Sequence, residues 1–268
     1  MSQPILIDTH AHLTFSDFDG DREAVLTRAH EAGVHSLIVI GSGHGLEINR
    51  KALDLAERQK NIWATVGIHP HEAQEADETY WEALHSLISH EKIVAMGEMG
   101  LDYYYGKENK PQQQTLLRRQ IRMAHESKLP IVIHCRDAEK DMQQILKEEG
   151  AEKVGGILHC FTGTRAFAEA MIEENFLISF SGIITFDKKV HDLQETAKAL
   201  PLEKILVETD CPYLAPPPFR GKRNEPAYVV KIAEKIALLK NVSLEEVAQQ
   251  TTQNAYKLFR IPSASAIT

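Results

Sequence analysis

The most restrictive feature of this sequence is a regular alternation of short apolar runs and helical patterns. The runs are rich in residues that favour β-strands, and they occupy 4–12, 36–40, 62–66, 93–98, 130–134, 155–159, 176–180 and 204–210. Each run is followed by a segment with helical periodicity. Strictly alternating strands and helices predict a parallel sheet, and eight such units predict closure into a (β/α)8 TIM barrel, an α/β fold.

An open, doubly wound sheet is the alternative arrangement for such a pattern. That fold normally requires a glycine-rich, phosphate-binding turn after its first strand. In this chain the corresponding place holds Thr9-His-Ala-His12. The barrel is therefore the preferred prediction.

Length and charge are compatible with one barrel. The 268 residues suit a single domain over 1–268, with a frayed tail predicted at 262–268. The net charge of −8 argues against a large basic surface for nucleic acid, but it is compatible with a small phosphate site.

The cellular compartment is predicted from cysteine usage and from the absence of targeting signals. Three cysteines form an odd, sparse set, as expected in a reducing compartment. The sequence shows no basic segment followed by an apolar core at its start, and no run of about 18 apolar residues. We therefore expect a cytoplasmic protein without a membrane segment.

Side chains that bind metals stand at the ends of the predicted strands. His10 and His12 are two residues apart on one strand, so they point to the same face. In a TIM barrel the carboxyl ends of the strands form the active-site face. Seven metal-competent side chains occupy such positions: His10, His12, His69, Glu98, His134, His159 and Asp210. Each alone is more often structural, but chance convergence of so many is improbable.

Four imidazoles and two carboxylates exceed the needs of one tetrahedral zinc ion with an open position. They suit two metal ions with a bridging carboxylate, and Glu98, near the middle of the set, is the bridging candidate. Two divalent cations with only two carboxylates would leave a net positive site, in which a water molecule can be activated. Phosphate esters and polarised carbonyls both suit such a site as substrates.

The alternation of side chains along the strands suggests further polar contributors. Asp8 and Glu208 each share a face with a strand-end candidate, so each could orient a ligand or pair with a charge inside the barrel. Arg136 could bind a phosphate through two hydrogen bonds or form a surface ion pair with Asp137 or Glu139. The residues alone leave these alternatives open.

The longest predicted loop, 211–226, contains five prolines and the basic residues Arg220, Lys222 and Arg223. Long loops of this kind are usually functional, so the three side chains are candidates for contacts with backbone phosphates, the alternative being a solvated loop.

Two interpretations also exist for the run Tyr103–Tyr105. These rings could stack on bases or pack a loop against the barrel.

Seven motifs together resemble the TatD family of metal-dependent deoxyribonucleases. They span nearly the whole chain: Asp8-Thr-His-Ala-His-Leu13, Gly67-Ile-His-Pro-His71, Gly97-Glu-Met-Gly-Leu-Asp102, Pro130-Ile-Val-Ile-His-Cys-Arg136, His159-Cys-Phe-Thr-Gly163, Glu208-Thr-Asp-Cys-Pro-Tyr213 and Arg220-Gly-Lys-Arg-Asn-Glu-Pro226. The resemblance implies a barrel of the amidohydrolase superfamily with six metal ligands: His10, His12, Glu98, His134, His159 and Asp210. Many amidohydrolases bridge their metals with a carboxylated lysine, whereas this chain offers Glu98.

For function, the resemblance implies hydrolysis of DNA phosphodiester bonds by a 3′–5′ exonuclease. The expected cofactors are two divalent ions per subunit (magnesium, manganese or zinc), and the expected partner is single-stranded DNA or a 3′ end. Glu98 and Asp210 are the expected catalytic residues, and His69, Arg136 and Arg223 the expected substrate contacts. The resemblance also leaves room for a deacylase of mischarged D-aminoacyl-tRNA or another ester or amide hydrolase. Outside enzymes, the alternative is a binding module with structural metals.

Overall fold

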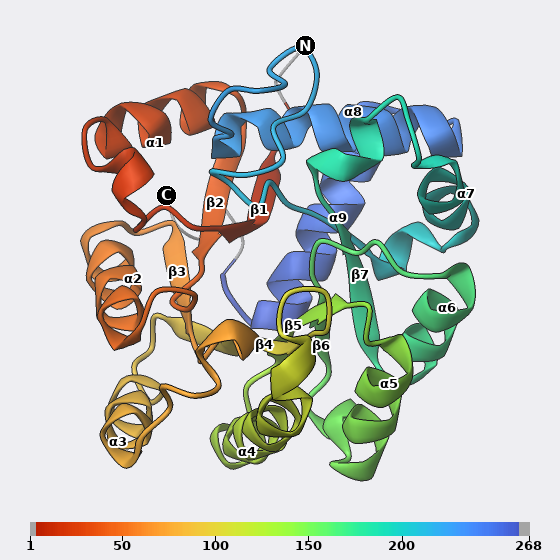
Figure 1. Cartoon of the computed structure of the whole chain (residues 1–268). Coiled ribbons are helices and arrows are strands. Elements are labelled where there is room, and N and C mark those ends of the chain that lie inside the picture. The colour runs from red at the N-terminus through yellow and green to blue at the C-terminus, as the bar shows by residue number, and fades with distance from the viewer. Residues whose placement is uncertain (1–3, 263–268) are drawn as a thin grey trace.

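The computed structural model describes residues 4–262, and in it eight parallel strands pair in sequence order to form one sheet. The strands are β1 Leu6–Ala11, β2 Val34–Val39, β3 Ile62–Val66, β4 Ile93–Asp102, β5 Ile131–Arg136, β6 Gly156–Leu158, β7 Phe176–Phe180 and β8 Ile205–Val207. The helices are α1 Arg22–Glu31, α2 Leu46–Arg58, α3 Glu78–Leu87, α4 Lys110–Ser127, α5 Glu139–Glu148, α6 Arg165–Glu173, α7 His191–Ala199, α8 Val229–Lys240 and α9 Leu244–Phe259. Figure 1 shows α1 to α8 in order around the strands.

The first strand and the segment after the last strand meet, and this contact closes the sheet. The backbone N–H of Asp210 donates to the carbonyl of His10 at 2.9 Å, and that of His12 donates to the carbonyl of Cys211 at 2.9 Å. Ala11 and Cys211 form a parallel bridge between the two segments. The predicted (β/α)8 TIM barrel is therefore confirmed.

β4 is longer than the sequence predicts. It was expected to end at Glu98, but it continues to Asp102 alongside β5. Gly100 pairs with His134 in this added part. A glycine is needed there, because a Cβ atom at position 100 would overlap the carbonyl oxygen of His134. The glycine therefore permits close strand pairing, although in the sequence it resembles a strand end.

β8 is shorter than predicted, because it ends at Val207 and not at Asp210. In the segment that follows, side-chain hydrogen bonds of Thr209 supplement the backbone hydrogen bonds of Glu208 and Asp210. The N–H and the hydroxyl of Thr209 both donate to the carboxylate of Asp8. Asp210 then adopts a left-handed backbone conformation, with φ of 56°.

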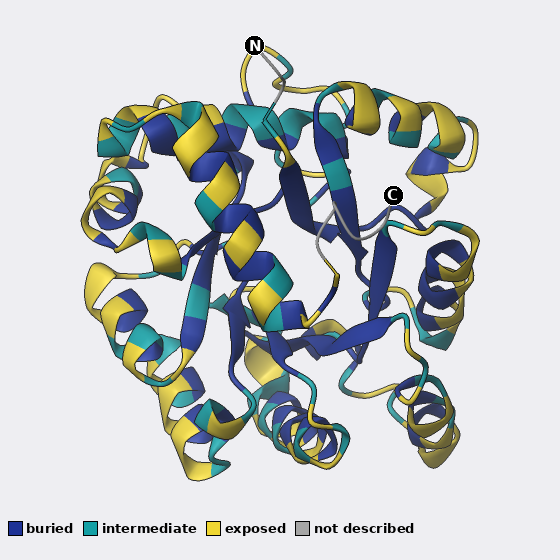
Figure 2. Ribbon diagram, turned by 180° about the vertical axis from the view of Figure 1, so that it is seen from behind, coloured by how far each residue is buried: buried dark blue, intermediate teal, exposed yellow. Residues whose placement is uncertain are grey.

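An apolar layer fills the barrel below the polar strand ends. It contains buried side chains such as Ile7, Val132 and Leu206 from three different strands. Helix α9 packs on β1 and β8 and crosses this end of the barrel, as Figure 2 shows from behind. Phe259, the last residue of α9, and Ile261, two residues beyond it, join the same layer. The amino-terminal end is therefore closed by apolar packing, which leaves the other end for polar chemistry.

Three expectations from the sequence concern the tail, membrane segments and the cysteines. Residues 263–268 of the predicted tail lie outside the described residues. Within 4–262, no helix combines the length and the apolar composition that are needed to cross a membrane. The three cysteines, all in the described range, are free thiols.

The close pairing of β4 and β5 predicts that Gly100→Ala destabilises the fold. A Cβ atom there would overlap the carbonyl oxygen of His134, and φ is +152°. We expect the free energy of unfolding to fall by about 1–3 kcal/mol, as in other overpacked sites. Denaturant unfolding followed by circular dichroism measures this change.

The matched control is Gly20→Ala, since a Cβ atom at position 20 would meet nothing within 4 Å. We expect that variant to lie within about 0.5 kcal/mol of the wild type. If Gly100→Ala were as stable as the control, the close approach would not constrain the barrel.

Candidate metal centre

The side chains predicted to bind metals lie together at the carboxyl end of the barrel. They are His10, His12, Glu98, His134, His159 and Asp210. Each belongs to a strand or follows one by no more than three residues. All except His10 line a cavity of about 640 Å³, and His10 is fully buried. Five strands of the barrel therefore contribute to one polar cluster.

One half of the cluster surrounds Oε2 of Glu98. The Nε2 atoms of His10 and His12 lie 3.2 Å apart, and Glu98 Oε2 is 3.5 Å from the first and 3.8 Å from the second. Oδ1 of Asp210 lies 3.7 and 3.4 Å from the same two nitrogens. Two imidazole nitrogens and two carboxylate oxygens thus face one another from β1, β4 and the segment after β8.

The other half surrounds Oε1 of Glu98. Nε2 of His159 lies 2.7 Å from this oxygen, and Nδ1 of His134 lies 3.0 Å from it. The two nitrogens are 3.3 Å apart. Nε2 of His69 is farther away, at 3.6 Å from the same oxygen. Glu98 therefore presents one oxygen to each half of the cluster, which is the arrangement of a bridging carboxylate.

Tight backbone packing positions Glu98. Its N–H donates to the hydroxyl of Ser42 at 3.0 Å. A Cβ atom on Gly97 would lie 2.8 Å from the Cβ of Val132, and one on Gly67 would lie 2.8 Å from the Cα of Gly97. These glycines let the chain segments at β3, β4 and β5 approach closely. The backbone that carries Glu98 is consequently held between its neighbours.

The surroundings keep both carboxylates of the cluster ionised. Burial alone would raise the pKa of Glu98, but the charge of His159 and the hydrogen bonds from His10 and His134 outweigh it and hold this pKa well below its usual value. Burial also opposes ionisation of Asp210, yet the hydrogen bond from His12 and the neighbouring imidazoles lower its pKa. Both groups are therefore anions, the form in which a carboxylate binds cations.

The imidazoles fall into two electrostatic classes. Burial lowers the pKa of His10, and it lowers that of His69 to about 4, so both rings are neutral. Burial acts in the same direction on His159, but the charges of Glu98 and Glu208 prevail and raise its pKa well above the usual value. The field around His159 thus favours a positive charge, either a proton or a metal cation.

The donor set fits metal ions. Ligand atoms of His10, His12 and Glu98 lie within 4.8 Å of one another, and so do those of His69, Glu98 and His134. The Nε2 atoms of His10 and His12 face each other at 3.2 Å, so only one proton fits between them. A cation between them would accept a lone pair from each. This chemistry is that of a metal site built from imidazole and carboxylate.

Two further carboxylates contact the cluster from outside. Oε1 of Glu208 accepts the N–H of Cys160 at 2.7 Å and lies 3.2 Å from Nδ1 of His159. Oδ2 of Asp102 lies 3.2 Å from Nε2 of His134. Contacts of this kind fix the ring orientation and the proton position of a ligating imidazole. Glu208 thus lies where the sequence placed it, whereas Asp102 was not predicted as a site residue.

Asp8 does not contact an imidazole ring in residues 4–262. Its oxygens accept the backbone N–H of His10 at 3.2 Å and both donors of Thr209. Burial raises its pKa to about 7. Asp8 therefore joins β1 to the segment after β8 and orients no ligand ring. Thr209 is 201 positions away in the chain, so the alternation of β1 alone does not identify this contact.

The centre carries more negative charge than predicted. Two carboxylates, Glu98 and Asp210, were expected to leave two divalent cations with an excess of positive charge. With Asp102 and Glu208 in contact with the imidazoles, four carboxylates can balance the four charges of two such cations. The excess of positive charge predicted from two carboxylates alone is therefore an overestimate.

The predicted substrate contacts divide between the cavity and its surroundings. His69 and Arg136 line the cavity with the metal-ligand candidates. The guanidinium carbon of Arg136 lies 4.1 Å from the ring centre of Tyr104 and 4.8 Å from that of Tyr105. Across the described residues no carboxylate pairs with Arg136, so its charge is available at the cavity wall.

Arg223 does not lie on the cavity wall but stabilises the loop that contains it. Its guanidinium contacts the two carboxylate oxygens of Asp21 at 2.8 and 2.7 Å and donates to the carbonyl of Asp17 at 2.6 Å. This pairing lowers the pKa of Asp21 to about 2. Arg220 packs on the ring of Phe186 at 3.6 Å. The loop 211–226 is thereby fastened to its neighbours, and Arg223 is not free to bind a phosphate.

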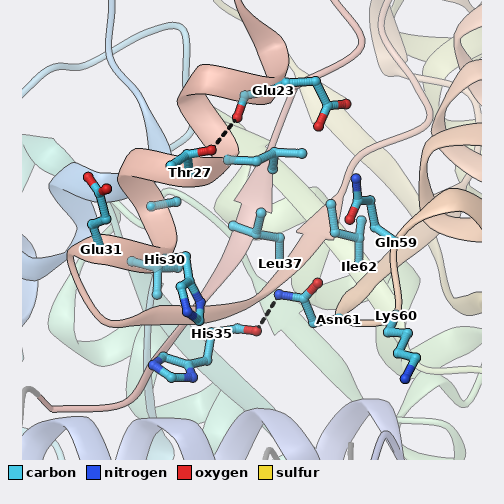
Figure 3. A pocket seen from close by; sticks show the side chains of 13 residues that line it. Glu23, Thr27, His30, Glu31, His35, Leu37, Gln59, Lys60, Asn61 and Ile62 are labelled. Atoms are coloured by element: carbon cyan, nitrogen blue, oxygen red, sulfur yellow. Dashed lines mark hydrogen bonds between the residues drawn. The ribbon is translucent and has the colours of Figure 1, made fainter. Parts of the chain in front are cut away.

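A second cavity, of about 580 Å³, lies at the opposite end of the barrel. Figure 3 shows His30 and His35 near each other in it, with ring centroids 4.9 Å apart. Burial lowers the pKa of His35. In Figure 3 the carboxylate of Glu31 points away from both rings. This pair therefore lacks the converging carboxylates that distinguish the first cluster.

Sequence reasoning missed Asp102 and His71. Nε2 of His71 lies 3.0 Å from Oδ2 of Asp102, which also contacts His134. Continuing the alternation of β4 beyond Gly100 would have placed Asp102 on the cavity side. His71 lies in the short helical turn Pro70–Glu72, where no strand periodicity exists to identify it.

Comparisons with known proteins identify the family of this barrel. The family model described as TatD related DNase matches residues 7–260. The chain is 47% identical to the uncharacterized metal-dependent hydrolase YabD of Bacillus subtilis, over 96% of this chain and 100% of the relative. It is 34% identical to the 3′-5′ ssDNA/RNA exonuclease TatD of Salmonella typhimurium, over 96% and 99%. The crystal structure of YJJV, a TatD homolog from Escherichia coli, matches with a TM-score of 0.89 and 31% identity, over 96% of this chain and 98% of that one. The chain therefore belongs to the TatD family and is a metal-dependent hydrolase.

Proposed function

We propose that the chain hydrolyses phosphodiester bonds at the 3′ ends of single-stranded DNA, with two divalent metal ions in the cluster described above. The observation that carries this proposal is the orientation of Glu98, whose two oxygens face separate sets of nitrogen donors. Magnesium, manganese or zinc is the expected ion. The residues that would hold the pair are His10, His12 and Asp210 on one side, His134 and His159 on the other, and Glu98 between them.

Relatives support this substrate class. The Salmonella typhimurium relative is named a 3′-5′ exonuclease of single-stranded DNA and RNA. The family description also refers to a DNase. In this chain the cavity lies at the carboxyl end of the strands, where TIM-barrel enzymes bind their substrates.

When bound, two divalent ions lower the pKa of a water molecule and stabilise the attacking and leaving oxygens of a displacement. Asp210, kept ionised by its imidazole neighbours, then serves as the base that accepts a proton from the attacking water. The water oxygen bonds to phosphorus, and the bond from phosphorus to the 3′ oxygen of the preceding nucleotide breaks. That oxygen takes up a proton and remains on the shortened strand as a 3′ hydroxyl.

Arg136 and His69 act on the substrate phosphate. The guanidinium of Arg136 lines the cavity and can bind two non-bridging oxygens at once. His69 is neutral, since burial lowers its pKa to about 4, so it can donate one hydrogen bond without adding charge. Together they hold the phosphorus in line with the attacking water.

Metal binding predicts a stability change that depends on Glu98. We expect addition of Mn²⁺ to chelator-treated protein to raise its melting temperature. At a metal concentration 100 times Kd, the stabilisation is about 2.7 kcal/mol for one site. Glu98→Gln replaces the shared anion by a neutral amide, so most of this increase should disappear. Differential scanning calorimetry with and without the metal measures the effect.

The control for this experiment is His85→Gln, which alters an exposed imidazole on α3. It should respond to Mn²⁺ as the wild type does. An undiminished response of Glu98→Gln would show that the ions are not held by this carboxylate.

Nuclease activity predicts a second, independent result. Wild-type protein with Mg²⁺ or Mn²⁺ should shorten 5′-labelled single-stranded DNA one nucleotide at a time. We expect the double variant His10→Ala/His12→Ala to lose roughly 100-fold or more of this rate, which corresponds to about 2.7 kcal/mol of barrier. Gel electrophoresis of the labelled products measures it, with His85→Ala as the control.

Equal degradation by the wild type and the double variant would assign the activity to a contaminant and defeat the proposal. Turnover of D-aminoacyl-tRNA faster than that of DNA ends would instead assign the same centre to ester hydrolysis.

A further inference from the structure

Exposed aromatic side chains gather at the open end of the barrel. Within residues 4–262, three are strongly exposed: Tyr104 at 57%, Tyr105 at 66% and Tyr213 at 52%. Tyr105 and Tyr213 line the same cavity as the metal-ligand candidates. Exposed apolar surface that collects around a cavity commonly marks a binding site. The location of these rings therefore points to a ligand with flat, apolar faces.

The two cavity tyrosines come from opposite sides of the barrel. Tyr105 follows β4, and Tyr213 follows β8. Since the strands pair in sequence order around a closed barrel, the ends of the fourth and eighth strands face each other across its axis. The metal-ligand candidates come from strands on both sides of that axis. A ligand that reaches both rings must therefore pass over the centre.

The backbone at Tyr105 is fixed relative to the metal centre. The N–H groups of Tyr104 and Tyr105 both donate to Oδ1 of Asp102, at 3.0 and 2.9 Å. Oδ2 of the same carboxylate contacts His134. One buried residue, Asp102, thus connects a ligand candidate to the aromatic pair. Arg136, packed against both rings, places a positive charge beside them.

The backbone at Tyr213 is fixed on the other side of the centre. Its N–H donates to the carbonyl of Asp210 at 3.0 Å, and its carbonyl accepts from the side chain of Asn224 at 2.6 Å. Its ring meets Phe15 and His12 edge-on, with centroids 6.5 and 6.4 Å apart. The ring is therefore held beside His12 while half of its surface stays open.

Tyr103 differs from its neighbours in the same run. It is buried, its hydroxyl donates to Asp141 at 2.8 Å, and the ammonium group of Lys110 lies 4.0 Å from its ring centre. Packing of the loop accounts for this residue. Tyr105 meets Arg136, and Tyr213 meets Phe15 and His12, yet more than half of each side chain stays exposed, so packing alone does not account for these two rings.

We propose that Tyr105 and Tyr213 are base-stacking residues on the two sides of the scissile phosphate, and that they select unpaired bases. This inference rests on the proposed nuclease function and specifies its substrate. Stacking of a base on an aromatic side chain contributes about 1–3 kcal/mol and tolerates any sequence. In a duplex the faces of the bases are covered by their neighbours, so two stacked bases require a single strand. Arg136, next to Tyr105, is placed to bind the phosphate between them.

The test combines protein variants with substrates that lack bases. One substrate is a ten-nucleotide oligothymidylate, and the other is the same strand with abasic residues at its two 3′-terminal positions. We expect Tyr105→Leu and Tyr213→Leu each to raise KM for the intact strand about 5- to 150-fold, with kcat nearly unchanged. On the abasic strand the wild type and both variants should have similar KM values, because the base that stacks is absent. Tyr105→Phe and Tyr213→Phe retain the ring and should restore the wild-type KM.

The control is Leu238→Ala, which removes an exposed apolar side chain on α8, away from the cavity. It should match the wild type on both strands. An equal loss of activity on both strands would contradict stacking, because the effect of the substitution would then not depend on the base. Unchanged KM values for both leucine variants on the intact strand would overturn the inference and leave the nuclease function in place. Failure of the wild type to hydrolyse either strand would overturn both.

Discussion

The carboxylate of Glu98 is the group on which the rest of this structure depends. It is buried between two sets of imidazoles, 2.7 Å from Nε2 of His159 and 3.5 Å from Nε2 of His10. A buried anion is strongly unfavourable unless cations or hydrogen-bond donors surround it. Here the donors come from strands on both sides of the barrel, so the charge can be satisfied only when the barrel is closed. Fold and centre are therefore stabilised by the same contacts.

The contacts that close the barrel between β1 and the segment after β8 also bring residues of the metal centre together. The backbone hydrogen bond from Asp210 to His10 joins the first and last parts of the sheet, and the same residues contribute donors to the cluster. The hydrogen bonds that Thr209 donates to Asp8 join the same two segments of the chain. On the opposite side, Gly100 lets β4 lie close to β5. The polar groups lie above an apolar layer that α9 closes, which confines the chemistry to one end.

The sequence was sufficient to predict the barrel and the residues that converge at its mouth. Five of the eight apolar runs end at a histidine or a carboxylate, and parallel strands bring such ends to one face. Asp102 was missed because the glycine at 100 resembles a strand end, and only tertiary pairing with β5 extends β4 past it. Arg223 was expected to bind phosphate, but its partner Asp21 is 202 positions away in the chain, a distance at which no local pattern gives information. The contact of Asp8 with Thr209 was not predicted, because the two residues are 201 positions apart.

Anomalous diffraction from crystals soaked in Zn²⁺ tests the central role of Glu98 most directly. We expect two peaks, one on each side of this carboxylate, with each of its oxygens about 2.0–2.2 Å from a different ion. The first ion should also contact the Nε2 atoms of His10 and His12, and the second should contact the rings of His134 and His159. A single ion, or two ions that both leave Glu98 uncoordinated, would contradict a shared carboxylate at the centre of the barrel.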